Sequence, residues 1–147
     1  MNCTAVIIDD EPCVRDVLKA LGHWNELGIT VVGEAEDGIA GLELVTQLKP
    51  DIVISDVKMP RMSGLELASR LQSVPCPPQV IIVSGYDDYN LVRQALKCGV
   101  TDYLLKPIGY DRFCRAMEYA HRELENTGRY IEVKVSRIMV KILLDDI

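Results

Sequence analysis

The stretch DIVISDVKMPRMSGLEL, residues 51–67, contains the pattern that decides the fold. Ile52–Ile54 is an apolar run rich in β-branched residues, which is typical of a parallel strand covered on both faces. Asp56 follows it directly, and from Gly64 onward apolar residues recur at helical spacing, at Leu67, Ala68 and Leu71. The segment therefore predicts a buried strand, an acidic loop and an amphipathic helix in succession.

The same succession of strand and helix is repeated on both sides of this segment. Four further apolar runs predict strands: Ala5–Ile8, Ile29–Val32, Val80–Val83 and Tyr103–Leu105. Helical spacing follows each of them: Val14 to Leu21, Leu42 to Leu48, Leu91 to Leu96 with a stop near Gly99, and Phe113 to Ala120. Strict alternation with short connections predicts an α/β fold, a doubly wound five-stranded parallel sheet with helices on both faces.

This alternation is complete by about Glu125, and a break of polar residues and glycine follows at 126–128. We expect one domain over residues 1–125 and a separate extension over residues 126–147. Apolar residues of the extension fall on one helical stripe, which favours a linker or an amphipathic helix, although the alternating IEVKV leaves a strand open.

Composition limits the classes of partner. The net charge is −6 and the 16 lysines and arginines form no basic stripe, so we expect no nucleic-acid contact by this chain. The five cysteines show neither CxxC pairs nor zinc-ligand spacing, which favours core or unpaired thiols in a reducing compartment. We find neither a leader nor an apolar run long enough to span a bilayer, and expect a cytoplasmic protein.

Polar residues stand where the predicted strands end. They are Asp9, Asp10 and Glu11 after the first strand, Asp56 after the third, Ser84 after the fourth and Lys106 after the fifth. Ligands of doubly wound sheets bind at the carboxyl ends of the strands, so these groups should meet at one edge. Packed carboxylates repel one another unless a cation lies between them, and oxygen-only ligands favour Mg²⁺. One carboxylate could then attack a phosphoryl donor.

Four motifs together resemble the receiver domains of two-component response regulators. They are VIIDDEP (6–12), the segment 51–67, VIIVSGYDD (80–88) and DYLLKP (102–107), and they cover roughly residues 4 to 124 in the family's order and spacing. The resemblance implies the flavodoxin-like strand order 2-1-3-4-5.

The resemblance also implies roles for single residues. Asp56 would be the phosphoacceptor, and Mg²⁺ would be held by Asp9, Asp10, Asp56 and the backbone carbonyl of Lys58. Lys106 would pair with the phosphoryl oxygens, next to a cis bond to Pro107. Ser84 and Tyr103 would form the conformational switch, but packing is an equal alternative for Tyr103.

The function implied is a signalling switch, not a turnover enzyme, that catalyses only its own phosphorylation and dephosphorylation. Its phosphoryl donor would be a sensor histidine kinase, and homodimers could form through the face of the fourth and fifth helices or through the C-terminal extension. The run SGYDDY before DYLLKP resembles receivers joined to AraC-type DNA-binding effectors. We therefore expect a part of a longer transcription regulator in preference to a protein that signals by contact alone.

Two other functions use similar folds. A phosphohydrolase of the haloacid-dehalogenase type has a nucleophilic aspartate, but its DxD motif follows the first strand, where this chain has adjacent Asp9 and Asp10. A flavin-binding module would need a loop rich in Gly, Ser and Thr at that point, and an acidic loop repels phosphate unless a metal intervenes.

Overall fold

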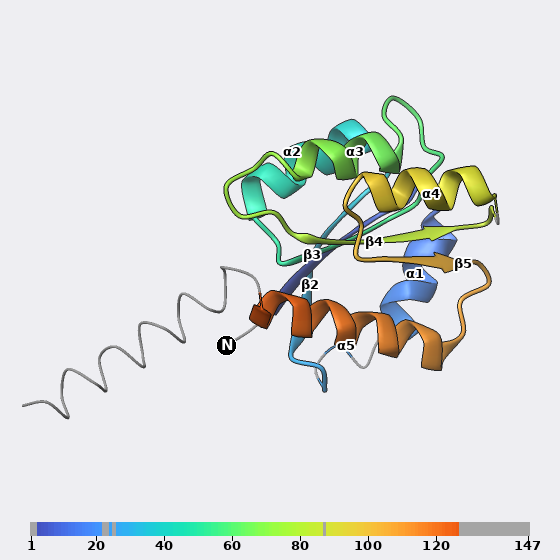
Figure 1. Ribbon diagram of the computed structural model, residues 1–147. Helices are drawn as coiled ribbons and strands as arrows, with labels where there is room; N and C mark the ends of the chain where they lie inside the picture. Colours follow the sequence, from blue (N-terminus) through green and yellow to red (C-terminus); the bar gives the residue numbers. More distant parts are fainter. Residues whose placement is uncertain (1–2, 22–23, 25, 87, 127–147) are drawn as a thin grey trace, which may run out of the picture.

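The computed structural model describes residues 3–21, 24, 26–86 and 88–126 of the chain. Within them strands and helices alternate as predicted (Figure 1). The elements are β1 (Cys3–Ile8), α1 (Pro12–Leu21), β2 (Ile29–Ala35), α2 (Gly38–Leu48), β3 (Ile52–Ser55), α3 (Gly64–Leu71), β4 (Gln79–Ser84), α4 (Tyr89–Lys97), β5 (Asp102–Leu105) and α5 (Tyr110–Asn126).

All neighbouring strands are parallel, and the sheet order is β2-β1-β3-β4-β5. This confirms the predicted doubly wound sheet and its flavodoxin-like order. The helices α1 and α5 cover one face and α2, α3 and α4 cover the other (Figure 1). The winding reverses between β1 and β3, so the ends of these two strands border the crevice in which such sheets bind ligands.

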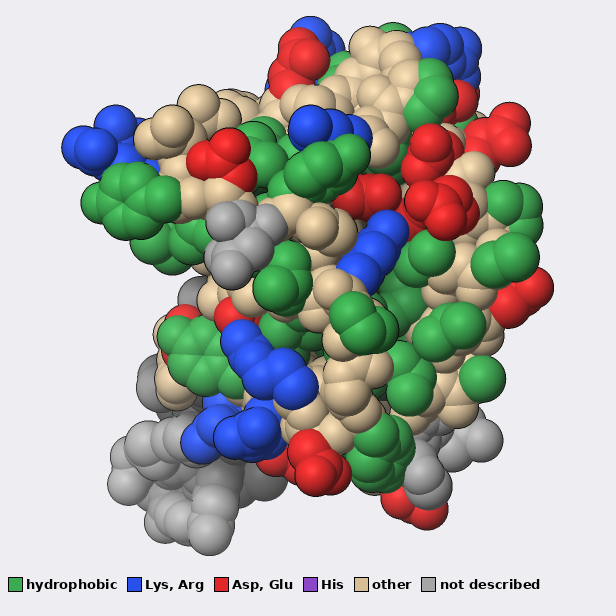
Figure 2. Space-filling view, turned by 90° about the vertical axis from the view of Figure 1, so that its right-hand side faces the viewer, with side chains coloured by type: hydrophobic (Ala, Val, Ile, Leu, Met, Phe, Trp, Pro, Cys, Tyr) green, Lys and Arg blue, Asp and Glu red, His purple; other side chains and the backbone are tan. Residues whose placement is uncertain are grey.

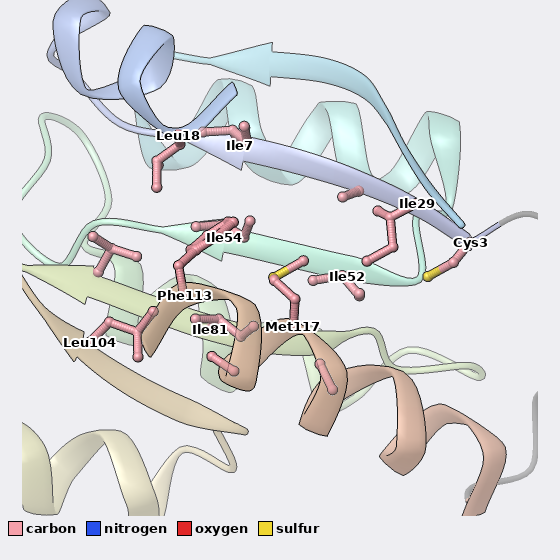
Figure 3. Packing of buried hydrophobic residues seen from close by; sticks show 14 of the residues in the cluster. Cys3, Ile7, Leu18, Ile29, Ile52, Ile54, Ile81, Leu104, Phe113 and Met117 are labelled. Carbon is pink, nitrogen blue, oxygen red and sulfur yellow. The ribbon is translucent and has the colours of Figure 1, made fainter. Parts of the chain in front are cut away.

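Two hydrophobic clusters, one on each face, explain why the central strands lack polar alternation. Along β1, Ala5 and Ile7 belong to the cluster under α1 and α5, whereas Val6 and Ile8 belong to the other cluster. Phe113 of α5 is fully buried against the first face of the sheet (Figure 3). Among the described strands, β2 alternates between exposed residues and residues that are buried or partly buried, as is possible for a strand at the edge of the sheet.

Three further expectations concern the cysteines, membrane-spanning helices and the C-terminal extension. Cys3 is a core residue, as expected for one of the thiols, whereas Cys13 and Cys76 are exposed. Among the described residues, none of the helices combines the length and the apolar character needed to cross a membrane. The predicted helical extension falls almost entirely on residues 127–147, which lie outside the described residues.

Candidate functional site

Three carboxylates meet at the edge of the sheet where β1 and β3 end. Asp9 and Asp10 follow β1, Asp56 follows β3, and the two strands are hydrogen-bonded neighbours. One carboxylate oxygen from each of the three residues lies within 4.8 Å of the others. Asp9 and Asp56 are buried and Asp10 is exposed. Figure 2, which faces this edge, shows acidic side chains gathered beside a basic one. The predicted convergence of acidic groups is therefore present.

Lys106 reaches the same place from the end of β5. Its Nζ lies 3.1 Å from Asp9 Oδ2 and 3.2 Å from Asp56 Oδ2. The backbone amide of Lys106 donates to the Ser84 carbonyl, which continues the pairing of β5 with β4, and the bond to Pro107 is cis as predicted. One ammonium group therefore bridges the two buried carboxylates and offsets part of their mutual repulsion.

Backbone contacts fix the direction of the Asp56 carboxylate. The amide of Asp56 donates to the Ile8 carbonyl at 3.0 Å, and the amide of Val57 donates to Asp56 Oδ1 at 2.7 Å. The hydroxyl of Ser55 donates to the Asp56 carbonyl at 2.9 Å. Because Oδ1 faces an amide and Oδ2 faces Lys106, the carboxylate is held in one orientation before any ligand binds.

Asp9 is held by contacts that the sequence did not reveal. Its Oδ1 accepts from the Glu11 amide at 2.9 Å, and its backbone carbonyl accepts from the Arg15 guanidinium. Arg15 in turn forms an ion pair with Glu34 of β2, with Nε 3.1 Å from the carboxylate. Through Arg15, these contacts connect Asp9 to α1 and to β2. No local pattern marks Arg15 for this role, because it depends on the position of β2.

Burial and charge shift the protonation of the two central groups. Burial raises the pKa of the Asp56 carboxyl, and the Asp9 charge adds to this rise, while Lys106 opposes it without cancelling it. Burial lowers the pKa of the Lys106 amine, but its hydrogen bonds and charge attraction to Asp9 and Asp56 prevail, so the net shift is upward. Lys106 is therefore an ammonium group at neutral pH.

Without a metal ion, we expect Asp56→Asn to melt at a higher temperature than the wild type at pH 7. A folded-state pKa above the unfolded value means that ionised Asp56 costs stability, and the shift already includes the attraction of Lys106. The difference should shrink as the pH falls through the raised pKa, because Asp56 of the wild type then becomes neutral. Mg²⁺ should also shrink it by stabilising the wild type. A lower melting temperature for metal-free Asp56→Asn at pH 7 would contradict this electrostatic account.

Ser84 ends β4, Tyr103 lies in the neighbouring β5, and the two residues share one contact partner, Tyr86. The fully buried Ser84 hydroxyl accepts from the Tyr86 amide at 3.1 Å. The Tyr103 hydroxyl donates to the Tyr86 carbonyl at 2.8 Å, and its ring packs against the cluster under α2, α3 and α4. Packing by Tyr103 is thus observed, and its role as a switch stays a prediction.

Lys58 connects the two loops on either side of the site. Its Nζ lies 3.8 Å from the centroid of the Tyr86 ring, a cation–π contact between the β3–α3 and β4–α4 loops. Both residues are exposed, so their side chains lie at the solvent boundary of the site.

The donor set is chemically suited to a hard divalent cation. Three carboxylates close together, two of them buried, carry more negative charge than one lysine offsets. Carboxylate oxygens with an exposed Asp10 beside them leave room for water and phosphate oxygens, as Mg²⁺ requires. The residues fit this ion, and they place a negatively charged nucleophile next to an ammonium group.

Comparison with known proteins shows the family to which the chain is similar. The family model of the response regulator receiver domain matches residues 5–118. The chain is 35% identical over 120 residues to the transcriptional regulatory protein YesN of Bacillus subtilis, covering 82% of this chain and 33% of YesN. It is 37% identical over 105 residues to the transcriptional regulatory protein HptR of Staphylococcus aureus, covering 71% of this chain and 41% of HptR.

Solved structures show the same similarity in three dimensions. The receiver domain of AraT, a response regulator from Geobacillus stearothermophilus, is 33% identical with a TM-score of 0.80, covering 86% of this chain and 98% of that one. The receiver domain of the response regulator NarL from Mycobacterium tuberculosis is 32% identical with a TM-score of 0.75, covering 82% of this chain and 97% of that one.

Proposed function

Because the chain belongs to the response regulator receiver domain family, we propose that it accepts one phosphoryl group on Asp56 in the presence of Mg²⁺. The observation that carries the proposal is the meeting of Asp9, Asp10, Asp56 and Lys106 at the carboxyl edge of the sheet. The four groups come from three strands, so only the folded chain brings them together.

The chemical step follows from the position of Asp56. An oxygen of its carboxylate attacks the phosphorus of a phosphohistidine on a sensor histidine kinase, a P–O bond forms, and the P–N bond breaks with the histidine as leaving group. Asp9, Asp10, Asp56 and the Lys58 carbonyl would hold Mg²⁺, which would supply neutralising charge for the phosphoryl oxygens. Lys106 stays protonated and pairs with a phosphoryl oxygen, which stabilises the negative charge of the acyl phosphate.

The response to phosphorylation uses the groups beside the site. The buried Ser84 hydroxyl turns from the Tyr86 amide to the phosphoryl group, and Tyr103 gives up its bond to the Tyr86 carbonyl. Both changes act on the β4–α4 loop, so α4 and the neighbouring β5 change their surface. Exposed apolar side chains at Leu96, Leu105 and Tyr119 suit this region to a homodimer contact.

The chain spans only 33% to 41% of the lengths of YesN and HptR. We propose that the phosphorylated state regulates transcription through an effector outside the described residues, with residues 126–147 as the connection. The same proposal includes three further points. The phosphoryl donor is a histidine kinase, and the chain catalyses its own dephosphorylation. Contact with nucleic acid is made by the effector and not by this chain.

Incubation with acetyl phosphate and MgCl₂, followed by intact-mass spectrometry, tests the proposal. We expect a mass increase of one phosphoryl group, which chelation of the metal before the incubation prevents. A chain that gains no mass under these conditions, or gains it equally without metal, would overturn the proposal. Continuous release of phosphate from small phosphoesters would indicate a hydrolase instead.

The contact between Lys58 and Tyr86 should prolong the life of the acyl phosphate. The two exposed side chains link the loop that follows Asp56 to the loop that follows Ser84, and we propose that this link restricts the approach of water to the phosphoryl group. We expect Lys58→Ala and Tyr86→Ala each to speed dephosphorylation several-fold, and the double variant to add little, because each single change breaks the same contact. Tyr89→Ala, which removes an exposed tyrosine of α4, is the matched control. Unchanged half-lives in both single variants would contradict the expectation.

A further inference from the structure

The β3–α3 loop, which carries Lys58, is tied to the start of α2 by an ion pair. Arg61 Nη2 lies 2.9 Å from Asp37 Oδ2 and 3.0 Å from Asp37 Oδ1. Asp37 is also the N-cap of α2, where its Oδ1 accepts from the Ala40 amide at 2.8 Å. The carboxylate is 11% exposed, so it offers Arg61 a fixed partner whose position α2 sets.

A second contact next to the ion pair holds the same two segments together. A Cβ atom at Gly38 would lie 2.3 Å from the Met62 carbonyl oxygen, so the two backbones touch where α2 begins. The Ala40 amide and the Arg61 guanidinium keep the pKa of the Asp37 carboxyl below its usual value, so the pair stays ionised at neutral pH. Adjacent residues 61 and 62 are thus both fixed against residues 37 and 38.

The backbone of Arg61 is held in a conformation that its side chain disfavours. Its φ angle is 68°, in the left-handed region that glycine and asparagine adopt more readily than arginine. An arginine at this position carries a conformational cost that the pairing with Asp37 helps to offset. Glycine would adopt this backbone conformation at a lower cost than arginine, so the conformation alone does not explain an arginine at position 61.

We propose that Arg61 is a positioning residue for the metal site: its bond to Asp37 holds the β3–α3 loop so that the Lys58 carbonyl is presented to Mg²⁺. The inference rests on the proposed function, because it assumes that Mg²⁺ binds at Asp9, Asp10 and Asp56. Lys58 stands three residues before Arg61, and the other end of the loop is fixed by the Gly64 amide, which donates to the Val57 carbonyl at 2.8 Å. The loop is therefore anchored on both sides of the proposed ligand.

Magnesium affinity of the unphosphorylated chain tests the inference, measured by MgCl₂ titration of the backbone amide signals in NMR spectra. Arg61→Asn suits the left-handed backbone and removes the pair. We expect the Kd for Mg²⁺ to rise roughly fivefold, the size of effect that a partly exposed ion pair can supply. Loss of a positive charge by itself favours a bound cation, so the direction of the change separates positioning from electrostatics. Arg61→Gly should weaken Mg²⁺ binding by a similar factor.

Two further variants complete the experiment. Arg70→Asn removes the same charge from α3, where Arg70 pairs with Glu66, and it should leave the Kd unchanged or lower it.

Asp10→Asn should nearly abolish Mg²⁺ binding. If Asp10→Asn binds Mg²⁺ as the wild type does, the proposed metal site itself fails. If Asp10→Asn loses Mg²⁺ but Arg61→Asn and Arg61→Gly keep the wild-type Kd, only the role of Arg61 is overturned. Thermal unfolding of each variant establishes that the titrations compare folded chains.

Discussion

Asp56→Asn will lose phosphorylation by acetyl phosphate, with the rate falling by more than roughly 10³-fold, as removal of a nucleophile does in enzymes that form covalent intermediates. An amide group has nearly the size of a carboxylate but is neither charged nor nucleophilic, so the fold should remain while the acyl phosphate can no longer form. Intact-mass spectrometry after incubation with acetyl phosphate and Mg²⁺ measures the effect.

Asp16→Asn is the matched control for this variant. Asp16 lies on the exposed side of α1 with 74% of its side chain accessible, so the same chemical change there should leave phosphorylation intact. A phosphoryl adduct that persists on Asp56→Asn would contradict the account, because it would place the nucleophile on another carboxylate, such as Asp9 or Asp10.

Gly64→Ala will destabilise the fold and disturb the site together. A Cβ atom at this position would lie 1.8 Å from the Asp56 carbonyl oxygen and 3.0 Å from the Ser55 hydroxyl oxygen, so the start of α3, the backbone of Asp56 or both must shift. Overpacking of this kind costs about 3 kcal/mol. For a domain of this size the cost corresponds to roughly 10 °C in melting temperature, which differential scanning calorimetry measures.

Gly109→Ala separates this contact from the general effect of replacing glycine. A Cβ at Gly109 meets no atom within 4 Å in the part of the chain that the structure describes. The melting temperature of Gly109→Ala should therefore stay close to that of the wild type. Equal melting temperatures for Gly64→Ala and the wild type would show that the close approach of α3 to Asp56 is wrong.

Much of the fold follows from local patterns. The five predicted strands and five predicted helices are all present, because each apolar run is short and is followed by clear helical spacing, and four of the five runs are rich in Val and Ile. The structure extends several elements by a few residues; β2, for example, continues to Ala35 beyond the predicted end at Val32. The extra residues include Gly33 and Glu34, which lie on an edge strand where apolar character is not required.

The convergence of the site residues was predictable from the parallel arrangement of the strands. Carboxyl ends of parallel strands share one edge, so Asp9, Asp10, Asp56 and Lys106 had to approach one another once the sheet was parallel. Gly64, where the predicted third helix begins, lies so close to the Asp56 carbonyl oxygen that a Cβ atom there would be 1.8 Å from it.

Side-chain contacts between separate elements of the fold could not be predicted from the sequence. Examples are the pairs of Arg61 with Asp37, Arg15 with Glu34, and Tyr103 with the Tyr86 carbonyl, which join residues far apart in the chain. Each depends on where a different strand or helix ends in space, and no periodicity encodes that distance. These contacts decide how the loops around the acidic edge are held, so the structure was needed to assign them.

The most direct test of the central claim is a crystal structure of the chain with Mg²⁺ and beryllofluoride, which stands in for the phosphoryl group. The account predicts beryllofluoride on an Asp56 carboxylate oxygen, Mg²⁺ among Asp9, Asp10, Asp56 and the Lys58 carbonyl, and Lys106 Nζ on a fluorine atom. Beryllofluoride on another residue, or Mg²⁺ bound away from these carboxylates, would contradict it.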